Sequence, residues 1–190
     1  QAEIVEDLAG MIGKFRDIER EITRCIDTEG RVVDGASPKL AEIRRALRTH
    51  RQRVRDYLDG LVRSSSAQKH LQEPIVTLRN GRYVVPVKQE HRGEIPGSVH
   101  DHSTSGATIC VEPMPVVELN NQIRRLEVDE EKEVERILSD LSLQVAQRAD
   151  EMIHSIEAAA ELDFVFAKGR LALDWEATRP QLNSDGKVKI

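Results

Sequence analysis

The chain has 190 residues, of which 32% are charged and only 3% are aromatic, and its formal net charge is -5 at pH 7. Apolar residues make up 39% of the chain, which is enough for a folded core and excludes a disordered tail. So few aromatic residues argue against a sheet-dominated enzyme core, whereas the high charge favours long amphipathic helices. We therefore expect a mainly α fold with one or two domains.

The two cysteines, Cys25 and Cys110, are far apart and form neither a disulfide framework nor a Cys-x-x-Cys motif. A reducing, cytoplasmic location is therefore expected. No apolar run reaches the roughly 18 residues that cross a bilayer, and the N-terminus does not resemble a secretory signal, so no membrane partner is expected. Because the chain begins at Gln1, we expect a fragment of a longer protein.

Residues 1–74 are predicted to form a helical hairpin. In its first half, apolar residues recur at helical spacing on one stripe: Ile4, Leu8, Met11, Phe15, Ile18 and Ile22. The second helix is predicted to start at Ser37 and Pro38, an N-cap followed by proline at the first helical position. Its stripe runs from Leu40 to Leu61 and includes His50, for which a packed seam position is expected. Pro74 prevents the helix from continuing further.

Residues 75–112 are predicted to form a small inserted antiparallel β module. Two β-branched runs flank Asn80-Gly81, the pair preferred in two-residue hairpin turns. Pro86 should confine the second strand of this hairpin to an edge or a bulge. Two further short strands are predicted over 98–102 and 107–112.

Residues 113–178 are predicted to form one long return helix. Apolar residues keep three-four spacing from Leu119 to Ala159, except where Glu130 occupies an apolar slot, and the helix could continue to about Trp175. Residues 179–190 are interpreted as the start of a following domain, with its first hairpin over 182–190. The expected architecture is thus a coiled-coil-like arm of long antiparallel helices that carries the β module.

Charge is distributed in blocks along the chain. Residues 38–92 carry 13 basic and 5 acidic residues, whereas residues 112–163 carry 5 basic and 14 acidic residues. The densest basic run has no acidic residue within it and consists of Arg44, Arg45, Arg48, Arg51, Arg53 and Arg55. These arginines could neutralise phosphates, or they could pair with the acidic run 127–135 of a neighbouring helix. The spacing alone does not choose between these two interpretations.

The polar segment 97–106 is the one concentration of chemically versatile side chains. Phosphate-binding loops and the His-Glu-x-x-His motif are absent from the chain. As a metal site, His100 and His102 would share one strand face, with Cys110 or Glu112 completing the ligand set. As a nucleophilic triad, His100 and Asp101 would act with Ser103 or Ser105, although adjacent strand residues point to opposite faces.

The favoured interpretation of this segment is a structural turn. Ser, Thr and Asp side chains would cap backbone amides, and Gly106 would supply the unusual dihedral. A further alternative is backbone contact with a phosphate-bearing partner, aided by nearby cations. Those cations are Arg79, Arg82, Lys88 and Arg92.

Several motifs together resemble the MutS-two family, the second bacterial paralogue of MutS. They are Leu-Arg-Asn-Gly-Arg-Tyr-Val-Val-Pro-Val-Lys at 78–88, Arg92-Gly93, Val99-His100-Asp101, Ser105-Gly106, Glu112-Pro113 and Val-Val-Glu-Leu-Asn-Asn at 116–121. The segment 163–172 is similar to the region of the family that precedes its ATPase domain. Residues 1–70 match only in helical character, and His102 and Cys110 depart from the usual pattern.

This resemblance implies a place for the chain in a longer protein. The helices would be core and lever helices, and the β module would lie where mismatch-repair MutS inserts its DNA clamp. The parent would be a homodimeric DNA-binding ATPase and endonuclease that uses ATP and Mg²⁺, with a C-terminal Smr nuclease domain. The family is associated with branched DNA, suppression of recombination, and rescue of collided ribosomes, which adds ribosomal RNA as a possible partner.

No catalytic residue, metal or cofactor is assigned to this segment itself. Contact with the nucleic-acid backbone is predicted for Arg44, Arg45, Arg48, Arg51, Arg53, Arg55, Arg79, Arg82, Lys88 and Arg92. A structural role or a partner contact is predicted for Asn80, Gly81, His100, Asp101, Ser103, Ser105 and Gly106. The alternative function is a structural, dimerising arm without nucleic-acid contact, in which the arginines point toward 127–135.

Overall fold

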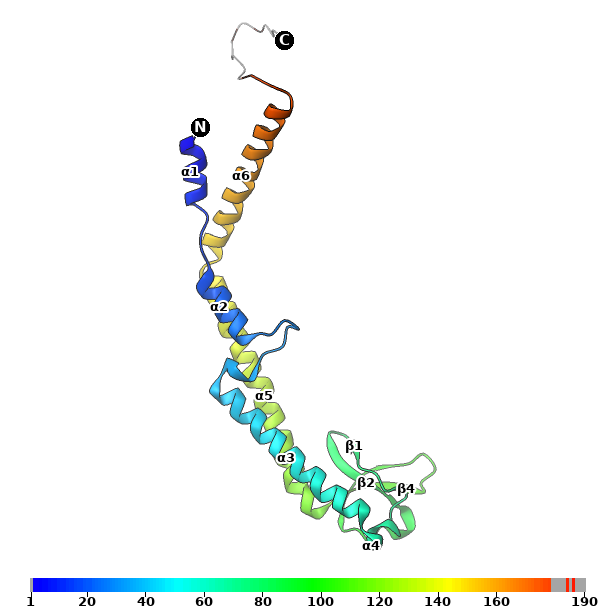
Figure 1. Ribbon diagram of the computed structural model, residues 1–190. Coiled ribbons are helices and arrows are strands. Elements are labelled where there is room, and N and C mark those ends of the chain that lie inside the picture. Colours follow the sequence, from blue (N-terminus) through cyan, green and yellow to red (C-terminus); the bar gives the residue numbers. More distant parts are fainter. Residues whose placement is uncertain (1, 179–183, 185, 187–190) are drawn as a thin grey trace. The chain divides into compact units, whose positions relative to one another are not determined.

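A computed structural model describes residues 2–178, 184 and 186 (Figure 1). The hairpin predicted over 182–190 lies outside the described residues. The chain divides into two compact units, one comprising residues 20–141 and the other comprising 1–19 together with 142–190. Each unit is described by itself below.

Along the chain, a first group of helices is followed by the strands of one short sheet and then by two long helices. The α-helices are α1 (Ala2–Gly10), α2 (Arg16–Cys25), α3 (Pro38–Arg63), α4 (Ser65–Gln68), α5 (Met114–Gln147) and α6 (Ala149–Asp174). The 3-10 turns are η1 (Asp34–Ala36) and η2 (Gln89–His91). The strands are β1 (Thr77–Arg79), β2 (Arg82–Lys88), β3 (Gly97–His102) and β4 (Thr108–Pro113). The predicted mainly α fold with a small antiparallel sheet is confirmed.

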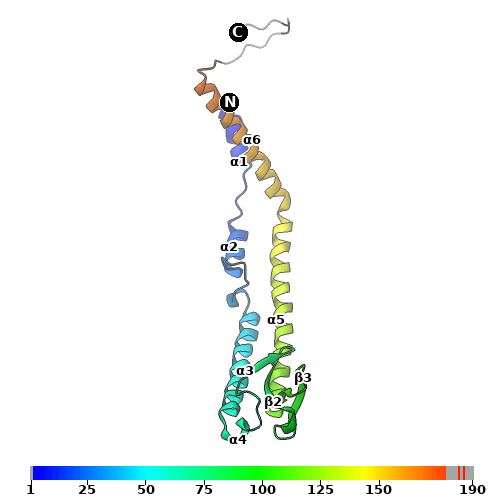
Figure 2. The same cartoon turned by 90° about the vertical axis from the view of Figure 1, so that its right-hand side faces the viewer.

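The unit of residues 20–141 is built on the antiparallel helices α3 and α5, which lie side by side (Figures 1 and 2). Helix α3 begins at Pro38 as predicted, and the Ser37 hydroxyl accepts a hydrogen bond from the Leu40 amide at 3.0 Å. Leu47 and Leu58 of α3 share a buried core with Ile123 of α5. This core continues into the sheet, so the helix pair and the β module fold as one unit.

The four strands form an antiparallel sheet in the order β1-β2-β4-β3, at the α4 end of the helix pair (Figure 2). The predicted hairpin turn is confirmed, because Asn80 and Gly81 both have positive φ, at 50° and 74°. Val87 of β2 and Ile109 of β4 are fully buried in the core that α3 and α5 share. The sheet is therefore anchored on the helices by its central strands.

Pro86 lies in a central strand, so the prediction of an edge strand was wrong. Strand β2 pairs with β1 only as far as Val84 and pairs with β4 from Val85 onward. The Pro86 carbonyl accepts a hydrogen bond from the Gln72 amide at 2.9 Å, on the side away from β4. Since N and O of a strand residue face the same side, the missing N–H also faces that side, where β1 has already ended.

The other unit packs α1 against α6, with Leu8 buried among Ala158 and Leu162. The continuous helix expected from Ile4 to Ile22 is interrupted between α1 and α2. Gly13 lies in this break, where a Cβ would come within 2.8 Å of the Phe15 ring. Its amide donates to the Ser155 hydroxyl at 2.8 Å.

The long return helix is also broken, at Arg148 between α5 and α6. The Arg148 guanidinium pairs with Glu151 at 2.8 Å and with Asp17 at 3.1 Å, and it lies 4.9 Å from the centre of the Phe15 ring. Beyond the break the predicted stripe also fails, because Ile156 is 69% exposed. Within the described residues, no helix is both long and apolar enough to cross a membrane.

Candidate nucleic-acid interface

One face of α3 directs its arginines at acidic groups of the same unit. Arg44 Nε donates to Glu130 at 2.6 Å, and its Nη1 donates to Asp34 at 2.9 Å and to the Val32 carbonyl at 2.8 Å. Arg51 Nη2 donates to Glu127 at 2.8 Å. Arginine side chains therefore join α3 to the acidic stretch of α5, as the scaffold interpretation requires.

Asp34 connects two of these arginines. Hydrogen bonds from Arg44 and then from Arg48 lower the pKa of the Asp34 carboxyl below its ordinary value. Partial burial alone would lower the pKa of Arg44, but its bonds to Asp34 and Glu130 outweigh burial and raise that pKa. Arg48 meets Asp34 at 3.1 Å, yet its side chain is 63% exposed. Arg48 is thus paired but still accessible.

The remaining arginines of the run are unpaired. Arg45, Arg53 and Arg55 are exposed, and none of their side chains makes an ion pair or hydrogen bond within the part of the chain that the structure describes. Arg55 borders a shallow hollow that Leu78 and Tyr83 of the first hairpin also line. The basic run therefore contains both paired and free arginines on one helix.

The cations of the β module also include both paired and unpaired side chains. Arg79 makes a long, half-exposed ion pair with Asp101 at 3.4 Å. Lys88 Nζ donates to the Lys69 carbonyl at 3.3 Å. The side chain of Arg92 is exposed and has no partner among the described residues.

Arg82 belongs to a buried polar network instead of the surface. Glu112 is only 1% exposed, and it accepts hydrogen bonds from Arg82 at 2.8 and 3.0 Å and from Asn120 at 2.7 Å. His100 Nε2 lies 2.6 Å from the same carboxylate. Arg82 Nη2 also donates to Asn121 at 2.6 Å, so both terminal nitrogens of its guanidinium are engaged by protein acceptors.

This network joins β2, β3 and β4 to α5, and the sequence analysis did not find it. Asn120 also exchanges hydrogen bonds with the Tyr83 backbone, at 3.3 and 3.4 Å. A buried carboxylate is stable only when its charge is balanced and its lone pairs are satisfied, and Arg82, Asn120 and His100 provide both. The sequence held one signal for this network, because the polar Asn120 directly follows Leu119 of the apolar stripe.

The metal and triad hypotheses for segment 97–106 find no matching geometry. The β3–β4 register shifts between Val99 and Asp101, and this bulge breaks the alternation that would have placed His100 with His102. His102 is exposed, whereas His100 contacts Glu112. Among the described residues, no three His, Cys, Asp or Glu side chains form a possible metal site.

The turn interpretation matches the contacts of this segment. The Ser103 hydroxyl accepts from the Thr108 amide at 3.0 Å and lies 3.3 Å from the Ser105 hydroxyl. Gly106 has φ of 72°, and its amide donates to the Ser103 carbonyl at 2.8 Å. Asp101 caps the His102 amide at 2.8 Å. These side chains close the β3–β4 hairpin.

Comparison with known proteins gives a consistent result. No protein-family profile matches the chain. The chain is 50% identical over 187 residues to a protein of Symbiobacterium thermophilum named Endonuclease MutS2, and 47% identical over 187 residues to the protein of the same name from Alkaliphilus oremlandii. Both alignments cover 98% of this chain but only 24% of the relative, so the chain spans about a quarter of the length of these proteins. A third relative of this name, from Pelotomaculum thermopropionicum, aligns over the whole chain at 47% identity. The chain belongs to the MutS2 family, as a segment of a longer protein.

Proposed function

We propose that this segment engages the sugar-phosphate backbone of nucleic acid through the free cations of α3 and the β module. The observation that carries the proposal is the set of three exposed arginines, Arg45, Arg53 and Arg55, which have no acidic partner within the described residues. Arg92 extends this set beyond the helix. Unpaired arginines at a surface are available to replace the counterions of phosphates.

The expected mechanism is electrostatic and independent of base sequence. Arg48 and Arg79 can join the contact because each is about half exposed or more and holds only a surface ion pair. Such pairs contribute roughly 0–1 kcal/mol, so they exchange readily for a phosphate. Arg44, Arg51 and Arg82 remain as structural residues in this proposal.

The test is a triple variant, Arg45→Ala with Arg53→Ala and Arg55→Ala. Binding of a mixed-sequence duplex and of a four-way DNA junction is measured from 50 to 200 mM salt. The slope of log affinity against log salt is negative, and each lost phosphate contact reduces its magnitude by about 0.9. We therefore expect the magnitude of the slope to fall by about 2 to 3. Ribosomal RNA in whole ribosomes serves as a second probe.

A matched control removes the same charge elsewhere, with Arg16→Ala, Arg20→Ala and Arg170→Ala on α2 and α6. The control should retain the slope of the unsubstituted chain. An equal reduction of the slope in both triple variants would mean that only the net charge matters. An unchanged slope in the α3 variant would reject the proposal.

For the parent protein we propose a wider role that follows from its family. The segment would transmit movement from an ATPase domain, which uses ATP and Mg²⁺, to the helices and β module that contact nucleic acid. The relatives are named endonucleases, so we propose a homodimeric nuclease and ATPase that acts on branched DNA or on ribosomal RNA, in recombination suppression or ribosome rescue. Nuclease and ATPase assays of the whole parent, with and without the α3 substitutions, test this role.

The second candidate function is a dimerising scaffold arm. The contacts of Arg44 with Glu130 and of Arg51 with Glu127 favour it, because they tie α3 to α5 and engage those guanidinium groups within the unit. Sedimentation velocity of the chain distinguishes the two functions. A stable dimer that binds neither DNA nor ribosomes at 50 mM salt would support the scaffold and exclude the phosphate interface.

A further inference from the structure

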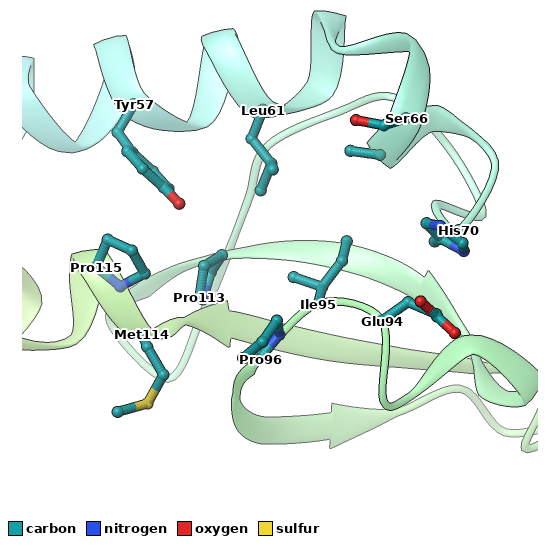
Figure 3. Close-up of a pocket in the computed structure, with 11 residues that line it drawn as sticks. Tyr57, Leu61, Ser66, His70, Glu94, Ile95, Pro96, Pro113, Met114 and Pro115 are labelled. Carbon is teal, nitrogen blue, oxygen red and sulfur yellow. The ribbon is translucent and has the colours of Figure 1, made fainter.

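A groove lies between the C-terminal half of α3 and the loops that flank the sheet (Figure 3). Tyr57 and Leu61 line one wall, and Pro96 and Pro113 line the opposite wall. The cavity volume is about 430 Å³. This volume lies within the range of about 300–1,000 Å³ that is typical of small-ligand sites.

The long walls of the groove are apolar and partly open to solvent. Tyr57 is 40% exposed and Met114 is 59% exposed, whereas Ile95 at the base is buried. In Figure 3 the Tyr57 hydroxyl points into the space between the walls. A flat apolar group can therefore enter between the Tyr57 ring and the proline side.

Polar groups gather at one end of the groove, where His70 and Glu94 lie together in Figure 3. The Nδ1 atom of His70 is buried and has no hydrogen-bond partner among the described residues. The His70 ring is held edge-to-face against His91, with centroids 4.9 Å apart.

Three cations lie close in the chain to His70 and Glu94, outside the lining of the groove. Lys69 precedes His70 in the chain, and Lys88 Nζ donates to the Lys69 carbonyl. The Lys88 amide in turn bonds to the His70 carbonyl at 3.0 Å. Arg92 is exposed two residues before Glu94. A flat apolar group therefore fits between the walls, and an anionic group that adjoins it outside the groove can contact these cations.

We propose that this groove takes one unpaired nucleobase of a nucleic-acid strand, while the adjoining phosphate contacts Lys69, Lys88 and Arg92. The inference rests on the proposed function and adds a site for a single-stranded nucleotide to it. The base stacks against Tyr57 and the prolines, which tolerates any base because every base has a π face. Glu94 can accept a hydrogen bond from an amino group on the base edge.

The experiment compares two probes of equal length and charge. One is a single-stranded oligonucleotide of mixed sequence, and the other is the same backbone with abasic sugars throughout. Stacking of one base is expected to favour the first probe by about 5- to 150-fold. The double variant Tyr57→Ala with Met114→Ala should remove this preference and leave the affinity for the abasic backbone unchanged.

The matched control is Leu138→Ala, which truncates a side chain with the same 40% exposure as Tyr57. Leu138 lies 24 residues beyond Met114 on the same helix, about 36 Å away along its axis. This variant should keep the preference of the unsubstituted chain for the probe that carries bases. Because both groove side chains are well exposed, the urea midpoint of the double variant should stay close to that of the parent, which separates lost binding from lost folding.

The outcomes distinguish this inference from the proposed function. Equal binding of the two probes overturns the nucleobase site and leaves the phosphate interface intact, whereas binding of neither probe rejects both. A preference for bases that survives in the double variant places the base elsewhere and overturns the site. A dimer that becomes monomeric in the double variant, without nucleic acid, assigns the groove to a second copy of the chain.

Discussion

The junction between the sheet and α5 and the outer surface of α3 both carry arginines, but the arginines have different surroundings. At the junction, Arg82 meets a carboxylate that is 1% exposed and that Asn120 and His100 also contact. On α3, Arg45 and Arg53 face solvent without a partner among the described residues. A buried charge must be matched for the fold to exist, whereas an exposed one is under no such constraint. The difference separates the structural arginines from those available to a ligand.

The largest expected effect comes from breaking the junction with Glu112→Ala. This change leaves Arg82, Asn120 and His100 without their common acceptor, and it should lower the free energy of unfolding by about 3 kcal/mol. Urea denaturation followed by far-ultraviolet circular dichroism measures the loss. The value lies at the lower end for buried pairs because the Arg82 side chain is 28% exposed and can partly rehydrate.

Asp101→Ala is the matched control for this change in the same sheet. Asp101 holds Arg79 at 3.4 Å with both side chains about half exposed, and it accepts from the exposed His102 amide at 2.8 Å, so its loss should cost only about 1 kcal/mol. If the two variants were equally stable, the buried network would not anchor the sheet, and the contrast between the two regions would fail.

Glu133 gives a pH-dependent effect of intermediate size. Arg136, aided by Ser37 and Lys39, lowers the pKa of the buried Glu133 carboxyl from 4.5 to about 2, although burial opposes this. A depressed folded-state pKa stabilises the protein fully above pH 4.5, and the contribution is lost as the pH falls toward 2. Since Arg136 and Lys39 are solvent-exposed, we expect about 1–2 kcal/mol from this group.

The measurement is the free energy of unfolding of the Glu133→Gln variant and of the unsubstituted chain, at several pH values between about 2 and 7. The difference between them should shrink as the pH falls through this window. Glu135→Gln is the control, because Glu135 is exposed on the same helix and makes no contact with a described partner. A Glu133→Gln difference that stayed constant with pH would contradict the depressed pKa.

The sequence predicted those elements whose signal is local. The cap at Ser37 and Pro38 and the Asn80-Gly81 turn depend on neighbouring residues, and both are confirmed. The helical stripe of α3 is confirmed only in part, because beyond Val54 the buried residues are Leu58 and Val62 and the predicted Tyr57 is 40% exposed. The breaks near Gly13 and at Arg148 were missed, because both depend on side chains from distant parts of the chain. An apolar repeat with three-four spacing cannot reveal such a tertiary contact.

The candidate interface was predictable in outline but not in detail. Charge counts located the basic run, yet which arginines are free depends on where Asp34, Glu127 and Glu130 lie in three dimensions. The groove was missed for the same reason. Tyr57 and Pro113 are more than 50 residues apart in the sequence and meet only when α3 packs on the sheet.

The smallest expected effect separates two adjacent residues of α3. Arg44→Ala removes bonds to Glu130, Asp34 and the Val32 carbonyl, and it should lower the free energy of unfolding by about 1 kcal/mol. Arg45→Ala removes no contact with a described residue, so its effect should stay within about 0.5 kcal/mol.

The same two variants should exchange order in DNA binding at low salt. Arg45→Ala is expected to weaken binding and to reduce the salt slope by about 1, whereas Arg44→Ala should leave the slope unchanged because its guanidinium is already held by carboxylates. The two variants lose the same charge at neighbouring positions, so only the environment of each arginine can reverse their order. Parallel losses of stability and binding in both variants would mean that α3 has no distinct structural and ligand-facing sides.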